Sequence, residues 1–471
     1  MKSVLLVNPI SGRGHLDSYA RLYSRALIEL GYRVILVAAT DGGCTDYLLR
    51  NVPNSARSFS FVSFDQAAGT APRGHMKLAE RARMVWRDEG AFGLMMRCVR
   101  VPCRALVSLV PKPVQRQAGR IWRALGRHLL RTRIARALKL PAHFDGGRIP
   151  FRTLCDYAGN ASQIAGHAPG FLFFLYLDLM AEMKRNTVVL DRPGMPPWSG
   201  ILFHPRLVSG SDAGTEGYFQ SENARGGVFL VPEAITAYTS AMPHLHFALA
   251  PDVADLELPA APPKLAHEIR SRAGDRTVVL QIGSITAHKG IPTLLDVISA
   301  ADPDRFYFAL VGEVHWETFG PQKARVRSFY ASPPENVFLF QEYVDSERDY
   351  NGVLEASDII YAVYQNFGSS SNSLTKAAGL CRPILVSDAS LMGERVRLSN
   401  IGAVAPEENA AIILERLNWL AMQPAARFGF AEFSREQSLE SLKVILADAL
   451  NSWAFGPRNA PTPARTPKPP A

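Results

Sequence analysis

Residues 365–382 have the composition of a phosphate-binding turn that opens a helix. Two apolar runs, at 358–364 and 383–386, flank this segment and are predicted to be strands. Gly368 would end the first strand in a turn, followed by the hydroxyl and free N–H groups of Ser369, Ser370, Ser371 and Asn372, which we call the serine turn. The spacing of apolar residues predicts a helix over 374–380, whose N-terminus would attract an anion through its dipole. Strand, polar turn and helix in this order indicate a nucleotide-type ligand.

The elements that must position this turn follow from an alternation of apolar strand-length runs with helix-length stretches. The alternation occurs in two series, which is typical of open parallel sheets in α/β proteins. The first series predicts strands at 4–7, 33–39 and 170–177, with a helix at 16–30. The second series predicts strands at 277–283, 307–312, 337–340, 359–363 and 384–386, with a helix at 291–300.

The chain divides into two predicted domains and a tail. A stretch rich in Pro and Ala at 250–264 suits a linker between the two series, so we place an N-terminal domain at 1–248 and a C-terminal domain at 249–455. The remaining residues, 456–471, hold six prolines and no apolar periodicity. This composition predicts a disordered tail.

The overall composition fits a soluble, cytoplasmic enzyme. Of the 471 residues, 47% are hydrophobic and 20% are charged, which is enough apolar material for two cores. The first residues lack the apolar stretch of a signal peptide, and the apolar run at 170–177 is broken by Asp178 before it could cross a bilayer. The five cysteines do not have the spacing of a metal site, so we expect reduced thiols and no bound metal.

The net charge of +9 is concentrated in one segment. Twelve Lys or Arg residues and no acidic residue lie between Glu89 and Asp145, which leaves the rest of the chain at about −3. An amphipathic helix is predicted within an insert at about 95–140, and its basic face carries Arg116, Arg120, Arg123, Arg127 and Arg131. Three interpretations stay open: a solvated surface helix, a helix lying on an anionic membrane, or a nucleic-acid-binding surface. Nucleic acid is the least favoured, because Trp122 is the only aromatic residue of this helix that could stack on a base.

Four segments of the second half occur in an order and spacing that resemble a known family. They are the strand end at 281–290, which closes in Lys-Gly, the strand end at 310–312, the helix-to-strand segment at 355–360, and the segment at 368–383. Over about 278–394 they resemble the C-terminal domain of retaining glycosyltransferases of the GT-B fold, in particular glycosyltransferase family 4. The first half matches more loosely, through Gly12 and Gly14 and the strand ends at 203–206 and 229–233. The resemblance implies an α/β protein with two Rossmann-like, doubly wound parallel-sheet domains that face each other across a cleft.

The resemblance also implies a site for a sugar nucleotide between the domains. In such enzymes a basic pair after the first C-terminal strand and the N–H groups of the signature helix hold the diphosphate. Lys289 matches one basic position, but Ser284 stands at the other and brings no charge. Gly283, Gly312 and Gly368 are candidates for close approach to the donor, although Gly283 and Gly312 are as readily explained as turn glycines. The nucleotide sugar is a substrate, so no cofactor is implied, and a second cation near Lys289 would compensate for Ser284.

The family signature carries two glutamates, one associated with the donor sugar and one with the ribose, and neither is present. No acidic residue occurs between Asp358 and Asp388. One alignment frame places Lys376 at the second position, where its ammonium only donates hydrogen bonds and so cannot replace a carboxylate. We expect Lys376 to approach phosphate instead. A divergent active transferase, a transferase with an unusual donor and a nucleotide-binding relic all remain open.

The candidate catalytic residues come from strand ends of the first half. His204 follows the apolar run 201–203 and is expected to contact the donor sugar or the acceptor, with Arg206 beside it. Asp178 and His167 are further candidates. The loop with Gly12 and Gly14, together with Arg13 and His15, is expected to cover the donor or acceptor, although a plain strand-to-helix turn is an alternative and its spacing does not indicate a dinucleotide site.

These expectations combine into one predicted function and one alternative. The predicted function is a hexosyltransferase-type glycosyltransferase, retaining and metal-independent, that acts on a glycan or lipid-linked acceptor in cell-envelope or polysaccharide biosynthesis. It would be cytoplasmic, with a peripheral position on the inner face of the membrane through the arginine-rich helix. The alternative is a catalytically inactive nucleotide- or glycan-binding homologue that acts as a scaffold.

Overall fold

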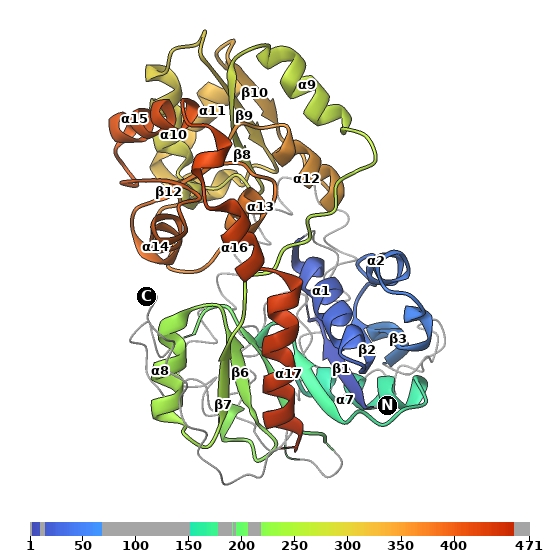
Figure 1. Ribbon diagram of the computed structural model, residues 1–471. Helices are drawn as coiled ribbons and strands as arrows, with labels where there is room; N and C mark the ends of the chain where they lie inside the picture. Colours follow the sequence, from blue (N-terminus) through green and yellow to red (C-terminus); the bar gives the residue numbers. More distant parts are fainter. Residues whose placement is uncertain are drawn as a thin grey trace, which may run out of the picture.

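The strands form two separate sheets in which every pairing is parallel (Figure 1). In the computed structural model of the chain, the described residues are 2–9, 15–67, 151–177, 191, 195–205 and 218–455. The N-terminal sheet has the order β3-β2-β1-β4-β5-β6-β7. Its strands are β1 (Ser3–Val7), β2 (Arg33–Ala38), β3 (Phe59–Ser63), β4 (Phe171–Phe174), β5 (Trp198–Leu202), β6 (Gly226–Phe229) and β7 (His246–Leu249).

The C-terminal sheet has the order β10-β9-β8-β11-β12-β13. Its strands are β8 (Thr277–Ile282), β9 (Phe306–Val311), β10 (Val337–Phe340), β11 (Ile359–Ala362), β12 (Ile384–Ser387) and β13 (Gly402–Ala405). The strands predicted from the second half of the sequence are therefore confirmed, and they lie in one sheet.

Helices cover these sheets because the central strands are apolar on both faces. Along β1, Leu5 and Val7 pack into one core cluster, whereas Val4 and Leu6 pack into another. In the N-terminal half the helices are α1 (His15–Glu29), α2 (Cys44–Asn51), α3 (Phe64–Ala67), α7 (Phe151–Ile164) and α8 (Pro232–Ala241). In the C-terminal half they are α9 (Lys264–Ala273), α10 (Ile291–Ala300), α11 (Lys323–Ala331), α12 (Glu347–Glu355), α13 (Ser373–Gly379), α14 (Ser390–Ser399), α15 (Ala410–Ala421), α16 (Phe430–Glu436) and α17 (Leu439–Phe455).

Both sheets reverse their strand order once. The reversal falls between β1 and β4 in the N-terminal sheet and between β8 and β11 in the C-terminal sheet. In open α/β sheets, ligands bind outside the carboxyl ends of the strands at such a point. The loops that follow β8 and β11 contain Lys289 and the serine turn, so the strand order by itself places both segments at a ligand-binding position.

The last helix corrects the predicted end of the C-terminal domain. Figure 1 shows α17, in red, lying against the lower, N-terminal domain. Trp453 is buried there, its ring stacked on Phe171 of β4 at 5.8 Å between centroids, and its indole N–H donates to the carbonyl of His246 at 3.0 Å. The chain therefore returns to the first domain at 439–455, because the apolar face of α17 is needed to cover the N-terminal sheet.

Several expectations fall on parts of the chain that lie outside the described residues. They are the arginine-rich helix within the insert at about 95–140 and the tail at 456–471. Among the residues that the structure describes, no helix has the length and apolar character needed to cross a membrane. The same residues contain no group of three or more His, Cys, Asp or Glu side chains placed to hold a metal ion.

Candidate functional site at the facing strand ends

The serine turn lies between β11 and the short helix α13. Because α13 spans only seven residues, its dipole is short, and Asn372 makes no side-chain cap to it. A helix of this length, which is also the length predicted from the sequence, attracts an anion only weakly at its N-terminus. Side chains around the turn therefore have to supply most of the attraction for an anion.

Lys289 supplies positive charge beside the turn. It ends the 3-10 turn η5 (Ala287–Lys289) after β8, and its Nζ lies 3.6 Å from the centroid of the Tyr364 ring. Burial alone would raise the pKa of Tyr364, but the Lys289 ammonium and hydrogen bonds from Lys289, Ser373 and Ser371 hold this pKa below its ordinary value. Lys289, Tyr364 and the serine turn thus form one electropositive group.

Close backbone contacts hold the loop of Lys289 in place. Gly290 has φ 71°, and a Cβ at this position would lie 2.2 Å from the Val363 carbonyl oxygen. A Cβ on Gly312 would lie 1.9 Å from the carbonyl oxygen of Gly283. Close packing of the strand ends therefore explains why positions 290 and 312 are glycine. Ser284, by contrast, is exposed and makes no such packing contact necessary.

The hydroxyls of the serine turn have different partners. Ser369 Oγ lies 2.7 Å from Nδ1 of His204, and Ser371 Oγ donates to Ser373 Oγ at 3.1 Å. The Ser370 hydroxyl donates to Asp252 and accepts a hydrogen bond from Arg395. The Ser370 hydroxyl therefore makes its hydrogen bonds within the protein, whereas the Ser369 hydroxyl faces the N-terminal domain.

His204 reaches the turn from the carboxyl end of β5. Its neighbour Phe203 fixes this strand end, with its ring stacked on Tyr176 at 5.0 Å and edge-on to Tyr19 at 5.1 Å between centroids. His204 itself is exposed, so its imidazole is open to solvent beside Ser369. The structure thus brings this predicted residue to the serine turn.

Lys376 does not approach the turn, contrary to expectation. Its side chain is 1% exposed, and its ammonium forms an ion pair with Glu347 at 2.7 Å. It also donates to the backbone oxygen of Asp255 at 3.0 Å and to the side chain of Asn351. The burial of an ammonium requires such partners, so Lys376 is committed to the interior between α12 and α13.

The remaining predicted residues divide into two groups. His167 precedes β4, and its Nε2 accepts a hydrogen bond from the Arg33 guanidinium, so it lies at the amino edge of the sheet, opposite His204. It is therefore not part of this site. Arg206, Asp178, Gly12 and Gly14 lie outside the described residues.

Three residues at this site carried no sequence signal. Asp252 lies in the segment between the domains, Arg395 lies on α14, and Glu407 follows β13. The Glu407 carboxylate accepts from the backbone N–H of Asn366 at 3.0 Å and from the Ser387 hydroxyl at 2.9 Å. Acidic residues that are missing from the local sequence therefore reach residues 366 and 370 from distant segments.

Arg395 supplies the second cation near the turn. Its Nη2 donates to the carbonyl of Leu230 at 2.7 Å, and its Nη1 lies 3.9 Å from the Asp252 carboxylate. Leu230 follows β6, so Arg395 links the strand ends of one domain to the serine turn of the other.

Comparisons with known proteins identify the fold. No family model and no curated protein matches the sequence. Among solved structures, the HepE protein of Anabaena in complex with UDP-glucose is 13% identical, with a TM-score of 0.54, over 96% of this chain and 100% of that chain. WaaG, a glycosyltransferase involved in lipopolysaccharide biosynthesis, is 12% identical, with a TM-score of 0.51, over 97% of this chain and 100% of that chain.

A third similar structure is a UDP-forming α,α-trehalose-phosphate synthase from Burkholderia xenovorans. It is 9% identical, with a TM-score of 0.54, over 96% of this chain and 99% of that chain. These likenesses extend over almost the whole of each chain and confirm the predicted fold class, an α/β protein with the two parallel-sheet domains of the GT-B fold.

Proposed function

We propose that the chain is a glycosyltransferase that moves a sugar from a nucleotide-sugar donor to a glycan or lipid-linked acceptor. The contact between His204 and Ser369 carries this proposal, because it joins the strand ends of both domains at the point where the strand order places a ligand. The similar fold of HepE, which was solved with UDP-glucose, supports a donor of this class.

The donor diphosphate would lie against Lys289 and the serine turn. Lys289 offers a positive charge and Ser369 offers a hydroxyl, and the two follow the carboxyl ends of the neighbouring strands β8 and β11. Arg395, whose charge is partly offset by the Asp252 carboxylate at 3.9 Å, would add a second cation in place of the arginine that Ser284 replaces. With two cations beside the leaving group, the proposed reaction does not require a metal ion.

His204 would contact the transferred sugar or the acceptor hydroxyl. In the proposed transfer, the bond between the anomeric carbon and the diphosphate oxygen breaks, and a bond to the acceptor oxygen forms. The acceptor proton leaves with the diphosphate or passes to solvent. Orientation of the two reactants accounts for much of the rate in such a reaction, and the imidazole beside Ser369 is placed to provide it. We propose the retaining outcome and membership of glycosyltransferase family 4 on the resemblance of residues 278–394.

The arginine-rich insert at about 95–140 is the basis for the proposed acceptor class and cellular position. The five arginines between 116 and 131 would hold the enzyme on an anionic membrane surface, where lipid-linked or cell-envelope glycans are extended. Failure of anionic liposomes to bind the protein at low salt would contradict this part alone.

A second candidate function is a nucleotide- or glycan-binding scaffold without activity. The observation that favours it is the position of Lys376, which faces Glu347 and Asn351 and leaves no carboxylate on α13 for a ribose. This candidate would bind a nucleoside diphosphate but consume no donor.

A thermal-shift screen with UDP, GDP and ADP tests the shared part of both candidates. A ligand present at 100 times its dissociation constant stabilises the folded protein by about 2.7 kcal/mol. We expect a shift with one of the three, and its loss in Lys289→Ala. No shift with any nucleotide would contradict the transferase and a nucleotide-binding scaffold, and would leave only a glycan-binding scaffold.

A further inference from the structure

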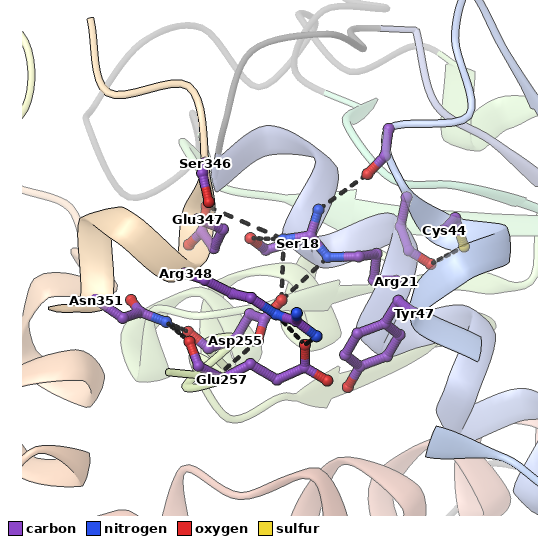
Figure 2. A network of polar contacts seen from close by, with 12 residues as sticks. Ser18, Arg21, Cys44, Tyr47, Asp255, Glu257, Ser346, Glu347, Arg348 and Asn351 are labelled. Atoms are coloured by element: carbon purple, nitrogen blue, oxygen red, sulfur yellow. Dashed lines mark hydrogen bonds and ion pairs between the residues drawn. The ribbon is translucent and has the colours of Figure 1, made fainter. Parts of the chain in front are cut away.

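The segment between the domains carries three acidic residues that each contact both domains. We call residues 250–263, between β7 and α9, the crossover. The second and third of these acidic residues, Asp255 and Glu257, lie between α1 and α2 on one side and α12 on the other (Figure 2). Each pairs with at least one arginine, so the crossover is fixed electrostatically along its length.

Asp255 and Glu257 hold the domains together away from the serine turn. The Asp255 carboxylate accepts from Arg21 of α1 at 3.1 Å, and its backbone oxygen accepts from Asn351 of α12 at 2.9 Å. The Glu257 carboxylate pairs with Arg50 of α2 at 3.3 Å and with Arg348 of α12 at 2.7 Å. Neither reaches a residue of the turn.

Asp252 is different because it ends on the turn. One carboxylate oxygen accepts from the Tyr19 hydroxyl of α1 at 2.6 Å, and the other accepts from the Ser370 hydroxyl. Its backbone is held at both ends, since its carbonyl accepts from Thr375 at 2.6 Å and its N–H donates to Gln437 at 2.7 Å. With a side chain only 3% exposed, Asp252 has little freedom to move independently of Tyr19 and Ser370.

Tyr19 also supports the other side of the site. Its ring packs edge-on against Phe203, the residue before His204. Burial, followed by the nearby Asp252 carboxylate, raises the pKa of Tyr19 well above its ordinary value, so the hydroxyl remains a donor at neutral pH. One side chain therefore contacts the strand end that carries His204 and, through Asp252, the turn that carries Ser369 and Ser370.

We propose that Tyr19 and Asp252 are positioning residues that hold the serine turn at a fixed distance from His204. The consequence of this arrangement rests on the proposed function: donor affinity depends on how the two domains are held relative to each other. Asp252 contacts the turn, Tyr19 reaches the turn through Asp252, and neither residue is proposed to contact the transferred sugar. Loss of the Tyr19 hydroxyl should loosen the turn although Tyr19 belongs to the other domain.

Tyr19→Phe and Tyr23→Phe form a matched pair for the test. Both tyrosines lie on α1 and are buried, and Tyr23 has a hydroxyl that bonds to no other side chain or backbone group among the described residues. Each substitution removes one hydroxyl and keeps the ring, so the packing against Phe203 and Phe173 persists. Only Tyr19→Phe removes a hydrogen bond to Asp252.

Hydrogen–deuterium exchange of the ligand-free protein gives the decisive measurement. We expect faster exchange at residues 366–380 in Tyr19→Phe, and wild-type exchange there in Tyr23→Phe. Asp252→Asn, which keeps the shape and removes the charge, should accelerate exchange in the same segment. Equal exchange at 366–380 in Tyr19→Phe, Asp252→Asn and the wild type would overturn the proposal, whether or not the protein binds a nucleotide.

Titration with UDP, GDP and ADP then measures the consequence for the site. The dissociation constant of the nucleotide that binds should rise about fivefold in Tyr19→Phe, the change expected for one hydrogen bond, and stay unchanged in Tyr23→Phe. An equal dissociation constant in both variants would overturn the positioning role. If the wild type binds none of the three, the proposed function fails, while the exchange experiment still decides the role of Tyr19 and Asp252.

Discussion

Nδ1 of His204 lies 2.7 Å from Oγ of Ser369, although 165 positions of sequence separate the two residues. His204 follows β5 of the N-terminal sheet, and Ser369 follows β11 of the C-terminal sheet. Two strand ends that belong to different domains therefore meet at the candidate site.

Replacement of His204 by Ala should impair transfer more than binding. We expect turnover of the donor to fall about 100-fold, because a positioned side chain at the reacting group is lost. The dissociation constant for the nucleoside diphosphate should change by about threefold at most, since one exposed hydrogen bond to Ser369 is removed. Steady-state kinetics and calorimetry measure the two effects.

His244→Ala is the matched control for His204. His244 is also exposed, but it lies before β7, at the opposite edge of the N-terminal sheet. Its replacement should leave both quantities unchanged. Equal turnover in His204→Ala and His244→Ala would remove His204 from the site.

Lys376→Glu restores an acidic residue on α13 and should destabilise the protein. The new carboxylate would lie beside Glu347 and the carbonyl of Asp255 in a buried position, at a cost of about 3–5 kcal/mol. The melting temperature should fall, whereas Lys264→Glu at the exposed start of α9 should have little effect. A stable Lys376→Glu protein with increased nucleotide affinity would mean that this position faces a ribose.

Nucleotide affinity should decrease at alkaline pH because of Tyr364. Its pKa lies below the ordinary value of 10.0, so the phenol loses its proton at a lower pH than a free tyrosine does. The resulting negative charge would pair with Lys289 and repel phosphate, so affinity for the nucleoside diphosphate should fall as the pH rises toward 10. Calorimetry across this range should show a smaller fall in Tyr364→Phe. Identical pH profiles would contradict the contact between Lys289 and Tyr364.

Trp453→Ala should destabilise the N-terminal domain although Trp453 belongs to the last helix. The indole is buried against Phe171, and its removal leaves a large cavity, which costs about 3–5 kcal/mol. Val444→Ala is the control on the same helix, because Val444 is 68% exposed. Urea unfolding followed in both variants tests this prediction. Equal stability would show that α17 is not part of the N-terminal core.

The elements of this fold could be predicted where local sequence determines them. The helix predicted at 291–300 is α10, since Gly290 ends the preceding turn and Pro292 occupies the first turn of the helix. The strand at 337–340 is β10 because an apolar run is bounded there by polar turns. The serine turn is also predicted correctly as a turn, because it is a polar segment between two apolar runs.

The parts that could not be predicted depend on contacts between distant residues. Asp252 reaches Ser370 across 118 positions and Tyr19 across 233, and no local pattern marks such a contact. The burial of Lys376 depends on Glu347, which lies on a different helix. The return of α17 to the first domain likewise reflects an apolar face whose partner, β4, lies far away in the sequence.

The most direct test of the proposed activity is the release of nucleoside diphosphate from a panel of UDP-, GDP- and ADP-sugars. Slow hydrolysis reports donor use without knowledge of the acceptor. We predict that the wild type consumes at least one donor and that Lys289→Ala lowers this rate by about tenfold or more, the effect of losing a hydrogen bond from a charged group. The control Lys264→Ala should retain the wild-type rate. A wild-type protein that binds a nucleoside diphosphate but consumes no donor, with or without added glycan acceptors, would contradict the transferase assignment.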